Sequence, residues 1–329
     1  MRRKGIRMKK KLFGSVLIVL VFALNLPAQA QQAKMPRIGF IRIGSPPDPL
    51  VEAFRLGLRQ LGYEEGKNIT VEYRWTDGKP ERLAAVAAEM VQGKLDVIVT
   101  SGSTTARAVK QATTTISIVI TAIPDPVGEG FVASLAHPGG NITGLSNLSP
   151  DLSGKRLEIL KEAFPKISRL AVLRTPEEEG GQTKAIEQVA KALGLNLQPF
   201  DVRTQTDIET AFSMMPKRKT DALIVIGSAI LFEHRMLLAE LAAKSRRPAM
   251  YPHAGFVDPG GLMSYGPDFS DLYRRAAIYV DKLLKGRKPN DLPVEQPMKF
   301  EFVINLKAAK QIGLTIPPNV LVRAQKVIR

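Results

Sequence analysis

Short apolar runs alternate with amphipathic segments along the chain, and the clearest example lies at residues 95–110. The β-branched run at 97–99 is typical of a strand buried on both faces of a parallel sheet. Small polar residues follow at 100–104, and an Ala-rich helix is expected next, with Ser103 or Thr104 as its N-cap. A strand, tight loop and helix start direct several backbone N–H groups to one point beyond the sheet edge, where open α/β folds bind ligands. An ordinary capped turn between a strand and a helix has the same pattern.

The same alternation of strand and helix signals covers the first half of the chain and then starts again. The expected strands are 37–43, 68–75, 97–99, 116–122, 141–145, 170–173, 195–202, 221–228 with its loop, 248–251, 262–265 and 299–304. The expected helices are 50–61, 80–91, 106–112, a short one at 127–135, 185–193, 207–215, 231–244, 269–284 and one from Leu306.

Matching landmarks in the two halves indicate an internal duplication. The helix-ending glycines Gly62 and Gly194 lie 132 residues apart, and Asp96 and Asp221, each before a strand, lie 125 residues apart. Strands that alternate with helices form parallel sheets. The sequence therefore predicts an α/β protein with two doubly wound parallel-sheet lobes of about five strands each.

The first 30 residues have the pattern of a cleavable signal peptide. A basic segment ends at Lys11, an uncharged apolar stretch covers residues 12–26, and the small-x-small site Ala28-Gln29-Ala30 follows. The apolar stretch is shorter than the ~20 residues that a membrane span prefers. We expect cleavage after Ala30 and export of the remainder, with an uncleaved anchor as the alternative.

Charge and cysteine content narrow the classes of protein. The net charge is +16, but residues 1–30 hold seven of the 47 basic residues and no acidic one, which leaves 40 basic against 31 acidic residues, or +9. The later basic residues form no run with interleaved aromatics, so we expect no nucleic-acid partner. The chain has no cysteine, which excludes disulfides, thiolate chemistry, Fe–S clusters and a lipid-modified cysteine. A freely soluble periplasmic protein is the simplest interpretation.

Six short motifs, in this order, give the chain a family resemblance over nearly all of residues 36–329. They are Gly62-Tyr-Xaa-Glu-Gly-Xaa-Asn68, Glu72-Tyr-Arg-Trp75, Asp125-Pro-Val127, Pro138-Gly-Gly-Asn-Ile-Thr-Gly144, Gly260-Gly-Leu-Met-Ser-Tyr-Gly266 and Leu292-Pro-Val-Glu-Gln-Pro297. With them the chain resembles the ABC transporter substrate-binding proteins of the tryptophan/tyrosine-binding type.

The resemblance implies the type I periplasmic binding protein fold, with two lobes joined by a three-segment hinge. The implied lobes are 36–145 plus 266–296 and 150–263 plus 300–329, and the implied crossing segments lie near 146–150, 264–268 and 297–302. The implied function is that of the periplasmic solute-binding component of an ABC importer. Such a component is a monomer that closes its lobes around a small carboxylate-bearing ligand, an amino acid or a related acid, and docks on a permease in the inner membrane.

Eight residues at strand ends are candidate ligand contacts. They are Ser45, Ser101, Ser103, Thr104, Asp125, Arg174, Ser228 and Tyr251. Ser103 and Thr104 are expected to hold an anion at a helix start, and the resemblance places the ligand carboxylate there. Asp125 either pairs with an ammonium group or only forms a turn between two prolines. Arg174 either takes a second carboxylate bidentately or is a solvated loop residue.

Other functional classes lack their own signals in this sequence. The three histidines, His137, His234 and His253, occur without a His-x-x-x-His pair, a Gly-x-Ser-x-Gly elbow or a Walker loop. We therefore expect no catalytic residue, no metal and no cofactor. A sugar-regulated repressor shares the fold but needs an N-terminal helix-turn-helix, which this chain lacks. A ligand-presenting sensor subunit for a membrane signalling protein would use the same cleft and remains an alternative.

Overall fold

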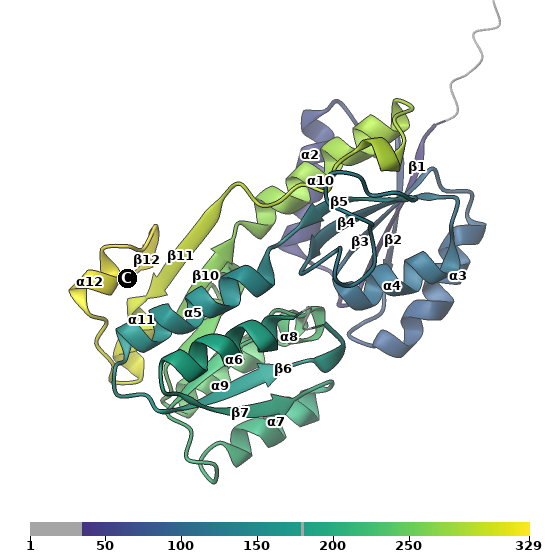
Figure 1. The fold of residues 1–329 in the computed structure, drawn as a ribbon. Coiled ribbons are helices and arrows are strands. Elements are labelled where there is room, and N and C mark those ends of the chain that lie inside the picture. Colours follow the sequence, from purple (N-terminus) through teal and green to yellow (C-terminus); the bar gives the residue numbers. More distant parts are fainter. Residues whose placement is uncertain (1–34, 179–180) are drawn as a thin grey trace, which may run out of the picture. The chain divides into compact units, whose positions relative to one another are not determined.

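The computed structural model describes residues 35–178 and 181–329, which form two parallel-strand sheets flanked by helices (Figure 1). The chain separates into the units Met1–Met35 and Pro36–Arg329, and the elements below belong to the second unit. The predicted signal peptide, residues 1–30, lies outside the described residues. Within those residues, no helix is long and apolar enough to span a bilayer.

The first sheet has five parallel strands in the order β2-β1-β3-β4-β5. Its strands are β1 (Arg37–Arg42), β2 (Thr70–Trp75), β3 (Val97–Ser101), β4 (Ser117–Ile123) and β5 (Ile142–Ser146), and its helices are α2 (Pro49–Gln60), α3 (Leu83–Gln92), α4 (Ser103–Ala112) and α10 (Phe269–Leu284). Successive side chains of a strand point to opposite faces. Val97 and Val99 therefore join the core under α2 and α10, while Ile98 joins the core under α3 and α4. Helices on both faces explain why the β-branched run at 97–99 is fully buried.

The second sheet has seven strands in the order β12-β11-β10-β9-β8-β6-β7, and only β10 and β11 pair antiparallel. Its strands are β6 (Arg169–Arg174), β7 (Asn196–Asp201), β8 (Ala222–Val225), β9 (Ala249–Tyr251), β10 (Met263–Pro267), β11 (Phe300–Asn305) and β12 (Lys326–Ile328). Its helices are α5 (Ser149–Ala163), α6 (Gln182–Ala192), α7 (Gln205–Met214), α8 (Ala229–Glu233), α9 (Arg235–Lys244), α11 (Leu306–Gln311) and α12 (Pro318–Leu321). The sheet exceeds the expected five strands because β11 and β12, from the end of the chain, extend it beyond β10.

The chain passes between the two sheets three times (Figure 1). It passes first between β5 and α5, then between β10 and α10, and finally before β11. The last passage begins beside the first sheet, because Glu295 forms a parallel bridge with Leu145 at the end of β5. The predicted fold class, two parallel-sheet lobes joined by three segments, is confirmed.

The helix expected at 127–135 is wrong, and this segment forms consecutive turns. Asp125 Oδ1 accepts a 2.8 Å hydrogen bond from the N–H of Gly128. The carbonyl of Pro126 accepts the N–H groups of Phe131 and Val132, at 2.9 and 3.1 Å. A side-chain acceptor that captures a nearby N–H competes with the helical ladder, and here the turn is the outcome.

Gly144→Ala should destabilise the protein by about 2–3 kcal/mol. Gly144 has φ +137°, and a Cβ there would lie 2.1 Å from the carbonyl oxygen of Ile120 on β4. The control is Gly140→Ala, because a Cβ at Gly140 meets nothing within 4 Å. Urea unfolding measures both changes, and we expect the control to stay within about 0.5 kcal/mol of wild type. Equal effects of the two substitutions would contradict the proposed clash.

Candidate functional site

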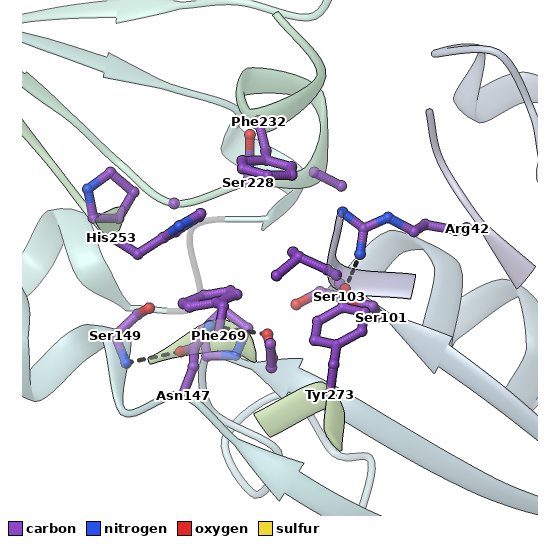
Figure 2. Close-up of a pocket in the computed structure, with 17 residues that line it drawn as sticks. Arg42, Ser101, Ser103, Asn147, Ser149, Ser228, Phe232, His253, Phe269 and Tyr273 are labelled. Atoms are coloured by element: carbon purple, nitrogen blue, oxygen red, sulfur yellow. Dashed lines mark hydrogen bonds between the residues drawn. The ribbon is translucent and has the colours of Figure 1, made fainter. Parts of the chain in front are cut away.

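A cavity lies where the carboxyl ends of strands from both sheets meet the crossing segments. It encloses about 560 Å³ when the space of its open mouth is counted. Its lining residues are Arg42, Leu50, Ser101, Gly102, Ser103, Ala122 and Pro124 from the first lobe, Gly227, Ser228, Ala229, Phe232, Pro252 and His253 from the second, and Asn147, Ser149, Phe269 and Tyr273 at the crossings. Figure 2 shows Arg42, Ser101, Ser103 and Tyr273 on one side, with Phe232 and Phe269 drawn above and below the middle.

The loop between β3 and α4 supplies one wall of the cavity. Gly102 turns the chain with φ +82°, and α4 then begins at Ser103 without a side-chain cap. The first N–H groups of a helix have no intrahelical acceptor, and the helix dipole favours an anion beside them. Ser103 is buried, and its Oγ makes no well-formed hydrogen bond among the described residues, although the nearby carboxylate of Glu129 interacts with it. This wall can therefore donate hydrogen bonds to a carboxylate.

Arg42, at the end of β1, places a buried guanidinium on the same wall. Its Nε lies 2.7 Å from Asp48 Oδ2, and its Nη1 donates to the hydroxyl of Tyr273, which in turn donates to Ser101 Oγ. Neither of these two contacts uses Nη2 of Arg42. Burial lowers the pKa of Arg42, and the charges of Asp48 and Glu233 oppose that effect. A guanidinium held at two nitrogens is a pre-oriented donor for an anion.

Aromatic side chains supply the apolar part of the cavity. The ring of His253 stacks on Phe269 with centroids 4.0 Å apart, and the ring of Phe232 lies 5.0 Å from His253. The guanidinium of Arg42 lies 5.7 Å from the centroid of Phe232 and 5.2 Å from that of Tyr273. Burial, together with the charges of Arg156, Arg42 and Arg235, lowers the pKa of His253 to about 3. His253 is thus a neutral aromatic ring at physiological pH.

Two polar residues near the cavity fix the crossing segments. Asn147 Nδ2 donates to the carbonyl of Ala122 at 2.9 Å, and its Oδ1 accepts the N–H of Ser149 at 3.0 Å. The buried guanidinium of Arg156 donates to the carbonyls of Tyr265 at 2.6 Å and Pro252 at 3.3 Å. Burial lowers the pKa of Arg156 to about 9. Both side chains use their hydrogen-bonding groups on the protein itself.

Three of the eight candidate residues line the cavity: Ser101, Ser103 and Ser228. Ser228 Oγ also accepts the N–H of Leu231 and so caps α8. Thr104 lies in the first turn of α4 and is not among the lining residues.

The structure places the other four candidates outside the cavity lining, and each has a local explanation. Ser45 Oγ lies 3.5 Å from Asp77, and the carboxylate of Asp125 closes the turn described above. Arg174 is directed away from the cavity because its Nε pairs with Asp201 at 2.7 Å on the adjacent strand β7. Tyr251 is fully buried and stacks on Phe256, with centroids 5.4 Å apart.

The sequence reasoning missed Arg42, His253 and the aromatic residues Phe232, Phe269 and Tyr273. Arg42 had a signal, because it is a charged residue at the end of a strand, directly after the apolar run 38–41. The aromatic residues had none, because their spacing fits ordinary core positions of helices.

His253→Gln should reduce the acid sensitivity of the fold. The imidazole has a pKa of about 3 in the folded protein and about 6.5 when unfolded, so the unfolded chain binds more protons between these values. The free energy of unfolding therefore falls as pH falls through this window, by up to about 1.4 kcal/mol per pH unit from this residue. Urea unfolding at pH 7 and pH 5 should show a smaller loss for His253→Gln than for wild type. The exposed His137→Gln is the control, and equal losses in wild type and His253→Gln would refute the assignment.

Several known proteins are similar to this chain in sequence or structure. The tyrosine-binding protein of Clostridioides difficile (strain R20291) is 27% identical over 297 residues, which cover 89% of this chain and 85% of that protein. The ABC domain from Streptococcus pneumonia in complex with L-Trp is 27% identical, with a TM-score of 0.82, and covers 89% of this chain and 99% of its own. The ligand-free, open structure of a substrate-binding protein with adhesive properties from Clostridium difficile is 25% identical with the same coverages, and its TM-score is 0.62.

The family described as ABC transporter substrate binding protein matches residues 46–328, which is most of the chain. This match agrees with the cavity between two parallel-sheet lobes and with the motifs read from the sequence. The chain belongs to the ABC transporter substrate-binding protein family.

Proposed function

We propose that this protein is the periplasmic solute-binding component of an ABC importer and captures a small carboxylate-bearing ligand, an amino acid or a related acid, between its lobes. The observation that carries the proposal is the convergence of the Arg42 guanidinium and the uncapped start of α4 on one cavity wall. A tyrosine-binding relative and an L-Trp-bound relative support a ligand of this size and class.

The proposed contacts divide between the two ends of the ligand. The carboxylate is bound by hydrogen-bond donors of one wall. These donors are Arg42 Nη2, the hydroxyls of Ser101 and Ser103, and the first N–H groups of α4, including that of Thr104. Phe232, Phe269 and Tyr273 bind the apolar body, and Ser228 offers a further hydroxyl. These side chains bind and orient a molecule, and none of them is assigned a catalytic role.

Ligand capture is proposed to proceed by closure of two rigid lobes, 36–145 plus 266–296 and 150–263 plus 300–329, about the three crossing segments. Two relatives with nearly equal sequence identity to this chain support the proposed closure. The chain resembles the L-Trp complex, with a TM-score of 0.82, more than the ligand-free open structure, with 0.62. The arrangement described here then corresponds to the closed form, which an inner-membrane permease would recognise. Export through the predicted signal peptide, cut after Ala30, would bring a monomer to that permease.

Arg42→Gln should weaken binding of the native ligand at least tenfold, because it removes the cation that faces the carboxylate. The ligand is first identified by native mass spectrometry of the purified protein, with a thermal-shift screen of small acids as a second route. Titration calorimetry then compares the variants. Arg174→Ala is the matched control, since it removes an arginine outside the cavity, and it should change the affinity less than twofold. A variant of Arg42 that folds and binds normally would refute the proposed site.

Ligand addition should decrease the radius of gyration measured by small-angle X-ray scattering, because the lobes approach each other on closure. The Arg42→Gln variant should show no decrease at a ligand concentration that saturates only the wild type. A wild-type radius that stays constant at saturation would contradict the proposed closure.

A further inference from the structure

Among the residues that the structure describes, those that line the cavity include a cation but no carboxylate, and this difference affects which charged groups a ligand can carry. Arg42 is a cation on the cavity wall, and none of the described residues that line the cavity is Asp or Glu. A free amino acid carries its ammonium and carboxylate groups on one carbon atom. Its ammonium group would therefore enter the same small space as its carboxylate, beside the guanidinium.

The carboxylates near the cavity belong to residues outside the lining set, and those of Asp48 and Glu129 already have partners. Asp48 uses Oδ2 to pair with Arg42 Nε and Oδ1 to accept the N–H of Leu50 at 2.8 Å. Glu129 faces Arg107 at 3.6 Å. Glu233 lies close to Gly44 and acts on Arg42, outside the lining set.

Three backbone carbonyls of lining residues also accept hydrogen bonds from the protein itself. Ala122 accepts Asn147 Nδ2, Pro252 accepts Arg156 Nη2, and Gly227 accepts Gln182 Nε2 at 3.3 Å. Positive charges also act at the cavity wall, where those of Arg156, Arg42 and Arg235 contribute to the lowered pKa of His253. A buried ammonium would find hydroxyl groups but no carboxylate among the described lining residues, and an uncompensated buried charge is unfavourable.

The remaining surface of the cavity suits a flat apolar body. The rings of Phe232 and Phe269 and the neutral ring of His253 line it next to the donor wall. Aromatic side chains contribute large apolar contact areas and favour tilted or stacked partner rings.

We propose that the ligand is an aromatic monocarboxylic acid without an α-ammonium group, which the cavity selects over the corresponding free amino acid. This inference rests on the proposed function, because it concerns the same cavity. The carboxylate serves as the counterion of Arg42, and the ring occupies the space between the aromatic side chains.

The test compares matched pairs of ligands that differ only in the ammonium group. Ligand-free protein lacking residues 1–30 is titrated by calorimetry with L-phenylalanine and 3-phenylpropanoate, L-tyrosine and 3-(4-hydroxyphenyl)propanoate, and L-tryptophan and indole-3-propanoate. We expect the acid of the best-binding pair to bind at least tenfold more tightly than its amino acid. Equal or tighter binding of the amino acid overturns the inference but leaves the proposed function in place.

A second measurement separates the two proposals completely. Native mass spectrometry that finds a retained amino acid or a non-aromatic acid overturns this inference and supports the proposed function. If no acid is retained, and none in either series or in the wider acid screen binds, both proposals fail.

A variant tests the electrostatic explanation directly. Ser149 lines the cavity at the first position of α5, where the helix dipole tolerates an acidic residue. Ser149→Asp should shift the affinity ratio at least tenfold toward the amino acid, whereas the uncharged Ser149→Asn should leave it near the wild-type value. A ratio that moves equally in both variants, or in neither, would contradict the explanation that a missing carboxylate sets the preference.

Discussion

A buried guanidinium joins three parts of the structure that are distant in the sequence. Arg42 ends the first strand of the first lobe, Tyr273 belongs to the helix that returns from the second crossing, and Phe232 belongs to the second lobe. Asp48, the N-cap of α2, balances part of its charge. Removal of one partner of a buried ion pair typically costs about 3–5 kcal/mol, because the other charge stays buried. The position of this cation therefore limits how the strand ends, the crossings and the opposite lobe can be arranged around the cavity.

The fold could be predicted from the sequence because its signals are local. The run at 97–99 is β-branched throughout, so its central, doubly covered position follows from residues next to each other in the chain. The turn at 127–135 shows where such reasoning stops. Its apolar spacing fits a helix, but one carboxylate, that of Asp125, captures the N–H of Gly128 and redirects the backbone.

The candidate site was only partly predictable, because its residues meet through the crossings. Ser101 ends a buried strand and Ser103 begins the next helix, so both could be found by position alone. Phe269 and Tyr273 lie on an amphipathic helix, whose pattern identifies a buried face but not which end of that face borders the cavity. For Arg174, position alone did not decide between a ligand contact and a surface residue. Its strand-end position suggested the cleft, yet Asp201 lies directly opposite it on β7 and pairs with it.

In the proposed closure, the same cation links ligand binding to the approach of the two lobes. A ligand can shift a conformational equilibrium only by its different affinity for the two forms. In an open form, water can solvate Arg42 and the start of α4. With the lobes as described here, burial disfavours the charge of Arg42, and Phe232 from the second lobe lies beside it. A carboxylate restores that lost solvation in the closed form, and its apolar body gains the ring of the second lobe at the same time. Both contributions are larger in the closed form than in the open one, so a ligand that combines an anion with a flat apolar group has the differential affinity that closure requires.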